Sequence, residues 1–248
     1  MNKVLVIGGL HGNEPLGLEV CAKLEKLNLP QVDVLYGNPE AINQNRRYID
    51  EDLNRCFPGD ASGSLEQSRA AEIMKQAAGY DIVIDFHNTH CPNNDCTFIG
   101  SQSKSISQLP VFLGLNRVVL ADAYDSINKY VNGCLSVEIS LSSPKFSVDG
   151  WVEKVISLKE FEPKKQCGQI QVYEFVYRIT REEQEKYNFP RWRAFGEVPP
   201  KDSEPLPIKT DEPLYAIFVD DAYTPYNYAA LIRKVDSPFK NRLNRQAK

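Results

Sequence analysis

Short apolar segments alternate with amphipathic ones through the N-terminal part of the chain. Residues 4–7, 32–36, 81–86 and 135–139 are rich in Val, Ile and Leu and predict strands. After the first of them, residues 16–27 place leucine and valine at helical spacing with charged residues on the opposite face, which predicts an amphipathic helix. Strands that alternate with helices predict an α/β fold with a mixed, mostly parallel sheet and helices on both faces.

The pattern changes after the last helix expected in this alternation. Residues 170–178 are rich in β-branched and aromatic residues, which favour strands. Many prolines follow between residues 190 and 213, and residues 214–219 predict a further strand. We therefore expect an α/β catalytic domain over residues 1–163, followed by a small β-rich domain over residues 164–248 that covers the active site.

Charge and hydropathy exclude several classes of protein. The 248 residues carry a formal net charge of −4 without a basic block, which disfavours binding to nucleic acid or to an anionic membrane. No apolar run approaches the roughly 20 residues of a membrane helix. The six cysteines form no CxxC pair and no export-signal pattern is present, so we expect reduced thiols and a cytoplasmic protein. A homo-oligomer is compatible with this composition.

The chain has three histidines, His11, His87 and His90. His11 follows the first predicted strand, and Glu14 lies three residues later, where a helix is expected to begin. His87 ends the strand predicted over residues 81–86. Sites in parallel α/β sheets gather beyond the carboxyl ends of the strands, so His11 and His87 should reach one edge. Two histidines and a glutamate form a known catalytic zinc set that leaves the fourth position to water.

Other interpretations of these residues stay open at this point. Each histidine taken alone would more often cap backbone groups in a loop than bind a metal. The joint position of His11 and His87 with Glu14 favours a zinc site. His90 is an alternative ligand to His87, although it lies further into the loop beside Cys91.

A long polar stretch, residues 38–63, is rich in Asn, Asp, Arg, Pro and Gly and predicts a loop without secondary structure. Loops of this length are uncommon in compact domains and are usually functional. It contains Arg47 and Arg55, and a guanidinium group pairs with carboxylates and polarises carbonyl oxygens. A solvated loop with internal ion pairs would account for the same residues.

Glu138 interrupts the apolar strand predicted over residues 135–139. A buried carboxylate is costly unless it is paired or its pKa is raised, and a raised pKa suits a general base. The pattern is equally compatible with a glutamate on an edge strand that faces solvent.

Six short motifs occur in an order that resembles the aspartoacylase and succinylglutamate desuccinylase family, a relative of the zinc carboxypeptidases. The motifs are Gly9-Leu-His-Gly-Asn-Glu14, Asn38-Pro39, Arg47-Tyr48, Asp52-Leu-Asn-Arg55, Asp85-Phe-His-Asn-Thr89 and Val137-Glu138. The ordered set is far more specific than any one motif. The resemblance covers residues 3–140 and extends more weakly to about residue 230, through residues 167–177 and 218–223.

The resemblance implies one zinc ion per chain, held by His11, Glu14 and His87, which agrees with the choice made from their spacing. It implies that Glu138 is the base that takes a proton from the attacking water and passes it to the leaving amine. Arg47 would help to stabilise the oxyanion that develops on the scissile carbonyl, usually a large contribution to catalysis.

The resemblance also implies which residues bind the substrate. Asn54 and Arg55 would hold a carboxylate of the amino-acid portion. Tyr124 would line the pocket, and Tyr223 would reach back from the C-terminal domain to close it. Aspartoacylases carry an arginine ten residues before the catalytic glutamate, where this chain has Asn128. The missing cation disfavours N-acetylaspartate as the substrate.

Together these features predict a zinc-dependent hydrolase that cleaves the amide bond of a small N-acyl amino acid. One alternative is a carboxypeptidase-like enzyme for short peptides or amino-acid conjugates. Another is a zinc-stabilised binding protein without turnover, although such a protein would need neither Glu138 nor Arg47.

Overall fold

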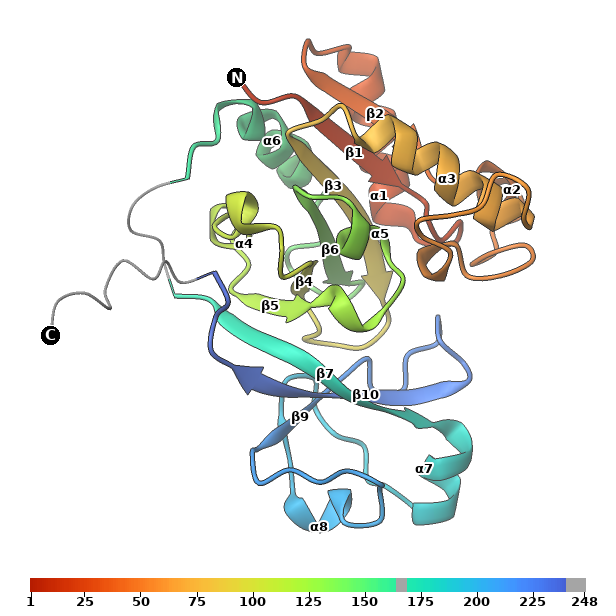
Figure 1. Ribbon diagram of the computed structural model, residues 1–248, viewed down its shortest axis with the longest axis vertical. Helices are drawn as coiled ribbons and strands as arrows, with labels where there is room; N and C mark the ends of the chain where they lie inside the picture. Colours follow the sequence, from red (N-terminus) through yellow and green to blue (C-terminus); the bar gives the residue numbers. More distant parts are fainter. Residues whose placement is uncertain (164–168, 240–248) are drawn as a thin grey trace, which may run out of the picture.

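A computed structural model describes residues 1–163 and 169–239 of the chain. Within these residues ten strands form one sheet, with the order β2-β1-β3-β6-β4-β5-β7-β10-β9-β8 (Figure 1). The strands are β1 (Val4–Gly8), β2 (Val32–Tyr36), β3 (Ile82–Thr89), β4 (Cys96–Ile99), β5 (Arg117–Leu120), β6 (Cys134–Ser140), β7 (Gln171–Thr180), β8 (Glu197–Val198), β9 (Leu214–Ile217) and β10 (Asn227–Val235).

The helices are short apart from three. The α-helices are α1 (Pro15–Leu27), α2 (Pro39–Asn43), α3 (Leu65–Ala77), α4 (Leu109–Phe112), α5 (Ile127–Tyr130), α6 (Val148–Ser157), α7 (Arg181–Tyr187) and α8 (Pro200–Ser203). The 3-10 helices are η1 (Leu53–Arg55), η2 (Lys104–Ile106), η3 (Ala121–Ala123) and η4 (Leu158–Glu160). None of the helices in the described ranges is long and apolar enough to cross a membrane.

The N-terminal strands form the parallel part of the sheet, as the alternation of strands and helices predicts. β1 pairs in parallel with β2 and β3, and β3 pairs in parallel with β6. Val4 and Val6 of β1 pack in a core with residues of α1 and α6. Leu5 and Ile7 face the other way and pack in a second core with residues of α3. Because alternate residues of a strand face opposite sides, β1 is buried by helices on both faces.

The C-terminal strands extend the same sheet. β7 pairs in parallel with β5, whereas β10, β9 and β8 follow in antiparallel order. In Figure 1 these strands lie beyond β5, on the side of the sheet away from β2. The mixed, mostly parallel sheet and the C-terminal strands are therefore confirmed, while the division into domains at residue 163 stays a prediction.

The polar stretch at residues 38–63 is not a loop without secondary structure, and that expectation is wrong. It contains α2, capped by the side chain of Asn38, and the 3-10 helix η1. The fully buried carboxylate of Glu66 organises the part between them. It accepts hydrogen bonds from the backbone N–H groups of Ile49, Asp50 and Glu51 at 2.7, 3.2 and 3.4 Å. Hydrogen bonds to a side chain of α3 thus hold the loop that carries Arg47.

Substitution of Glu66 by Gln is expected to lower the free energy of unfolding by about 1–3 kcal/mol, because an amide NH2 group cannot accept the hydrogen bonds of the loop. Urea denaturation would measure the change. Glu72→Gln on the same helix is the matched control, since this side chain is 56% exposed and pairs only with Arg69 at the surface. It should change the stability by less than about 1 kcal/mol. Equal effects of the two substitutions would contradict this role of Glu66.

The cysteines of the described ranges are free and buried, at positions 21, 56, 91, 96 and 134. Burial raises the pKa of the Cys21 thiol to about 12, so this thiol stays protonated at neutral pH. Cys167 lies outside the described residues.

Candidate functional site

Two neighbouring strands bring the predicted metal ligands together. Gly8 of β1 is paired with Phe86 of β3 in a parallel register, so the segments that follow these residues leave the sheet at the same edge. His11 lies in the turn after β1, and Glu14 immediately precedes α1. His87 does not end its strand as expected, because β3 continues to Thr89. The His87 backbone therefore lies inside the strand, where it is paired in register with Glu138 of β6.

The turn that carries His11 requires glycine at position 12. A Cβ atom on Gly12 would lie 2.2 to 2.4 Å from backbone atoms of Ala41 and Ile42. This close approach packs the turn against α2, and the Gly12 N–H donates to the carbonyl oxygen of Arg47 at 3.3 Å. The backbone next to His11 is thus fixed by the segment that also carries Arg47.

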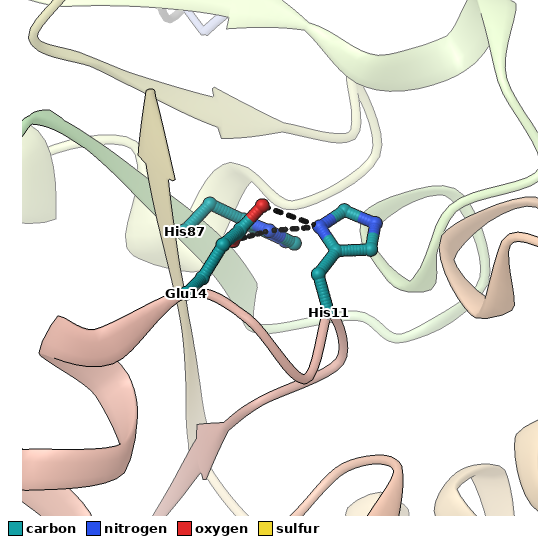
Figure 2. Close-up of side chains that lie close together, drawn as sticks. All are labelled: His11, Glu14 and His87. Atoms are coloured by element: carbon teal, nitrogen blue, oxygen red, sulfur yellow. Dashed lines mark hydrogen bonds and ion pairs between the residues drawn. The ribbon is translucent and has the colours of Figure 1, made fainter. Parts of the chain in front are cut away.

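The side chains of His11, Glu14 and His87 face one another (Figure 2). They are only 3%, 2% and 4% exposed, and one possible ligand atom from each lies within 4.8 Å of the others. Nδ1 of His11 lies 2.8 Å from Glu14 Oε1, and Nδ1 of His87 lies 2.9 Å from Glu14 Oε2. The two Nδ1 atoms are 3.1 Å apart. The structure therefore gathers two imidazoles and a carboxylate into one buried cluster.

Each imidazole also faces a second carboxylate through its other nitrogen. Nε2 of His11 lies 3.0 Å from Asp52 Oδ1, and Nε2 of His87 lies 2.7 Å from Asp85 Oδ2. A carboxylate at this position fixes the proton on Nε2 and leaves the Nδ1 lone pair for a metal, as outer carboxylates do in many zinc sites.

The cluster is electrostatically incomplete without a cation. With protons on both Nε2 atoms, two Nδ1 lone pairs and the Glu14 carboxylate converge on one point, where they repel one another. Burial lowers the pKa of His87, but Asp85 and Glu14 outweigh it and raise this pKa well above its usual value. The residues thus attract positive charge, and a nitrogen–oxygen set of two histidines and one carboxylate suits zinc. The chain contains a His-Glu-His site whose chemistry fits this metal.

Glu138 lies beside this cluster. β6 runs between β3 and β4, so Glu138 is on an interior strand, and its backbone is in register with His87. This position excludes the alternative in which Glu138 lies on an edge strand and faces solvent. The side chain is buried, and its Oε1 atom has no hydrogen-bond partner among the described residues. Burial, reinforced by the negative charge of Glu14, raises the pKa of Glu138 well above its ordinary value.

Arg47 reaches the cluster from the organised loop. Its guanidinium group donates to Glu14 Oε1 and to Asp52 Oδ2, both at 3.2 Å. Although burial acts against the charged form, Asp52 and Glu14 raise the pKa of Arg47 above its usual value. The residue is therefore a fixed positive charge at the entrance to the His-Glu-His site, and most of its N–H groups remain available.

A cavity of about 920 Å³, counting the space open to solvent at its mouth, connects these residues. The His-Glu-His site, Arg47 and Glu138 line its polar side, together with Asn54, Arg55 and Tyr124. The remaining lining is largely apolar and comes mostly from the strands after β3. Its residues are Phe98, Val119, Ala121, Phe175, Ile217, Phe218, Ala229, Ala230 and Ile232. A cavity that combines an apolar lining with a few convergent polar groups is typical of small-molecule sites.

Two of the predicted site residues have further contacts. The side-chain nitrogen of Asn54 lies 3.3 Å from Nε2 of His87, beside the metal cluster. Tyr223 is not among the residues that line the cavity, and its ring packs against His90 with the centroids 4.4 Å apart. Burial and the negative charges of Glu14, Asp221 and Glu138 raise the pKa of Tyr223 to about 12. Its hydroxyl therefore stays a proton donor, and its contact with substrate stays a prediction.

Asn128 borders the cavity but its polar atoms are used within the protein. Its side-chain nitrogen donates to the carbonyl oxygen of Phe98 at 3.1 Å, and its oxygen accepts from Ser136 Oγ at 3.0 Å. Asn128 is uncharged and buried, and because its amide groups already have partners it offers few free donors to a ligand. The departure from the aspartoacylase pattern thus changes the charge of this part of the cavity.

Sequence reasoning gave no role to four residues of the site. Asp52 and Asp85 lie inside motifs that it identified, but their partnership with the histidines depends on distances that spacing does not provide. Ser126 and Arg178 also line the cavity. The sequence gave one indication for Arg178, because it is a charged residue in a segment rich in apolar and aromatic residues. Glu138 likewise interrupts an apolar segment.

Comparison with known proteins supports one family. Residues 1–108 match the family described as the succinylglutamate desuccinylase/aspartoacylase catalytic domain. The chain is 32% identical over 129 residues to a probable aspartoacylase from a Nostoc species, covering 46% of the chain and 44% of that protein. It is 35% identical over 116 residues to the human N-acyl-aromatic-L-amino acid amidohydrolase, covering 39% of the chain and 36% of that protein. Each match therefore spans less than half of the relative's length.

Solved structures share the fold over a larger part of the chain. The succinylglutamate desuccinylase from Chromobacterium violaceum superposes with a TM-score of 0.69 at 18% identity, covering 94% of this chain and 84% of the other. Murine aminoacylase 3 gives a TM-score of 0.65 at 19% identity and covers 94% and 95%. The chain is therefore similar to the succinylglutamate desuccinylase and aspartoacylase family in the sequence of residues 1–108, and it shares its fold with these solved structures.

Proposed function

We propose that this protein is a zinc-dependent amidohydrolase that cleaves the acyl group from an N-acyl amino acid. The observation that carries the proposal is that one cavity holds both a His-Glu-His cluster and the buried Glu138, whose Oε1 atom has no partner among the described residues. A zinc ion held by His11, Glu14 and His87 would lower the pKa of water and polarise a carbonyl oxygen. The relatives named aspartoacylase and amidohydrolase support the same class of reaction.

The residues of the chain supply the proton transfers. Glu138 takes a proton from the attacking water as the water oxygen bonds to the carbonyl carbon of the amide. The raised pKa of Glu138 matches this task, because the protonated carboxyl group then gives the proton to the amide nitrogen. The C–N bond breaks, and the products are a carboxylate and an amino acid.

Arg47 stabilises the negative charge that develops on the carbonyl oxygen. Its guanidinium group is held by Glu14 and Asp52, so it needs little reorganisation when the charge appears. Asn54 and Arg55 bind the carboxylate of the amino acid, Tyr124 lines the pocket, and Tyr223 reaches back from the C-terminal part of the chain to close it. These assignments follow the family resemblance and agree with the lining of the cavity for all except Tyr223.

The apolar wall of the cavity indicates the kind of amino acid. Phe98, Phe175 and Phe218 line the cavity and present no charge to a side chain or acyl group. Asn128 is committed to internal hydrogen bonds and cannot pair with a second carboxylate as arginine does. Of the two substrate classes named for the relatives, N-acyl aromatic amino acids fit this cavity better than N-acylaspartate. A cytoplasmic location and the oligomeric state stay predictions.

A panel assay of the zinc-loaded protein tests the proposal. N-acetyl, N-formyl and N-succinyl derivatives of phenylalanine, leucine and aspartate, together with dipeptides that contain these residues, are incubated with the protein, and the free amino acid is quantified. We expect release from the aromatic and aliphatic derivatives to exceed release from N-acetylaspartate. Release only from dipeptides would assign the protein to carboxypeptidase-like enzymes. Stoichiometric zinc without release from any compound would indicate a binding protein.

A further inference from the structure

A chain of hydrogen bonds runs from the lining of the cavity to the His-Glu-His cluster. Asp85 Oδ2, which lies 2.7 Å from Nε2 of His87, also accepts a hydrogen bond from Ser136 Oγ at 2.8 Å. The same Ser136 oxygen lies 3.0 Å from the side-chain oxygen of Asn128. Asn128 and Ser136 both line the cavity, whereas Asp85 is not among the lining residues. Two residues of the lining are thus connected to a predicted metal ligand through a carboxylate behind the cavity wall.

The pairing of the strands fixes this chain. Ser136 of β6 is in parallel register with Asp85 of β3, so the two side chains leave the sheet side by side. On the other side of β6, Ser136 is in antiparallel register with Phe98 of β4. The carbonyl oxygen of Phe98 accepts a hydrogen bond from the Asn128 side-chain nitrogen at 3.1 Å. Ser136, Asp85 and Asn128 are only 2%, 0% and 1% exposed, so the fold holds all three in place.

The Asp85 carboxylate depends on the Ser136 hydroxyl. Its Oδ1 atom is buried without a hydrogen-bond partner among the described residues, so Oδ2 makes its contacts with His87 and Ser136. A buried carboxylate is costly unless hydrogen bonds compensate for the lost water. A hydroxyl group carries one proton, and here two acceptors share it, of which the charged carboxylate is the stronger. Loss of the Ser136 hydroxyl would therefore leave Asp85 with His87 as its one remaining side-chain partner in the described part of the chain.

We propose that Ser136, held in place by Asn128, is a positioning residue that fixes Asp85 and thereby the imidazole of His87 in the orientation that binds zinc. Outer carboxylates set the tautomer and the ring orientation of histidines that bind metals, and their own hydrogen bonds contribute to metal affinity. The inference rests on the proposed zinc-dependent function. It also gives a role to Asn128, which supports the metal site at the position where aspartoacylases carry an arginine.

Zinc affinity, measured by competition with a chromophoric chelator, tests this role without turnover. The Ser136→Thr and Ser136→Val proteins form a matched pair, because they differ only by the exchange of a hydroxyl for a methyl group. We expect the Ser136→Val protein to bind zinc about tenfold more weakly than the Ser136→Thr protein, at the lower end of the usual loss for an outer partner of a metal ligand. With cobalt(II) in place of zinc, the visible absorption bands should change in the Ser136→Val protein alone, since they report the geometry of the ligands.

A double-mutant cycle tests whether Asn128 acts through Ser136. Asn128→Ala should weaken zinc binding by about two- to fivefold when Ser136 is present, because residues of one hydrogen-bond network are coupled. In the Ser136→Ala background the same substitution should cause no further loss. An equal effect of Asn128→Ala in both backgrounds would contradict the connection between the two residues.

Ser140→Ala is the control for loss of a buried hydroxyl. Ser140 lies on the same strand and is also buried, but its hydroxyl donates to the carbonyl oxygen of Cys91 at 2.7 Å. This substitution should lower the urea midpoint without changing the zinc affinity. The role of Ser136 is overturned if the Ser136→Thr and Ser136→Val proteins bind zinc equally, if Ser140→Ala weakens zinc binding as much as Ser136→Ala, or if the wild-type protein binds no zinc. The expected zinc affinities without release of any amino acid would contradict the proposed function and leave the role of Ser136 standing.

Discussion

The His87→Ala protein is expected to lose its zinc and its amidohydrolase activity. His87 provides one of three donors, and removal of an outer partner of a metal ligand already costs about 10- to 100-fold in metal affinity. Loss of the ligand itself should cost more than about 100-fold. Zinc content after dialysis, measured by mass spectrometry against about one ion per chain in the wild type, gives the result directly.

His90→Ala is the matched control for this substitution. His90 is the alternative ligand that the sequence leaves open, but it does not belong to the cluster of His11, Glu14 and His87, and its ring packs on Tyr223. The His90→Ala protein should keep its full zinc content. If His90→Ala loses zinc while His87→Ala retains it, the ligand set proposed here is wrong.

The Glu138→Gln protein is expected to bind zinc normally but to hydrolyse substrate between about 100-fold and 10,000-fold more slowly, the usual contribution of a general base. Glutamine has nearly the same shape but cannot accept the proton of water. The loss should appear in kcat, because Glu138 acts on the reacting atoms and is not one of the residues expected to bind the substrate carboxylate. Steady-state kinetics on the best substrate of the panel and zinc analysis of the same sample would measure both properties.

Glu19→Gln, an exposed position on α1, serves as the control for charge removal and should leave the rate unchanged. A Glu138→Gln protein that keeps the wild-type rate would exclude Glu138 as the base. Loss of zinc from this variant would instead indicate that Glu138 contributes to metal binding, which its separation from the His-Glu-His cluster argues against.

The parallel half of the sheet could be predicted from the sequence because its pattern is local. β1 and the helix that follows it show the apolar spacing of their own secondary structure, and the glycines of the turn leave little freedom in between. Once two such strands run in parallel, their carboxyl ends share an edge. The proximity of His11 and His87 was therefore predictable before any distance was known.

The antiparallel insertion of β4 between β6 and β5 could not be predicted in this way. β4 has only four residues, and short apolar runs do not specify their partner or direction. The α2 and η1 helices were also missed, because their stability comes from capping by Asn38 and Asp52 and from the loop contacts of Glu66. These are tertiary or side-chain effects that override a polar composition typical of loops.

The sequence by itself indicated the α/β class and the grouping of His11, Glu14 and His87, since both depend on residue type at a short and regular spacing. The role of Glu138 as the base came from the family resemblance and stays a prediction. Only the tertiary structure decided that Asp52 and Asp85 face the histidines and that Ser136 donates to Asp85. The geometry of those contacts is set by the register of the strands and by the packing of the loops, which no local pattern encodes.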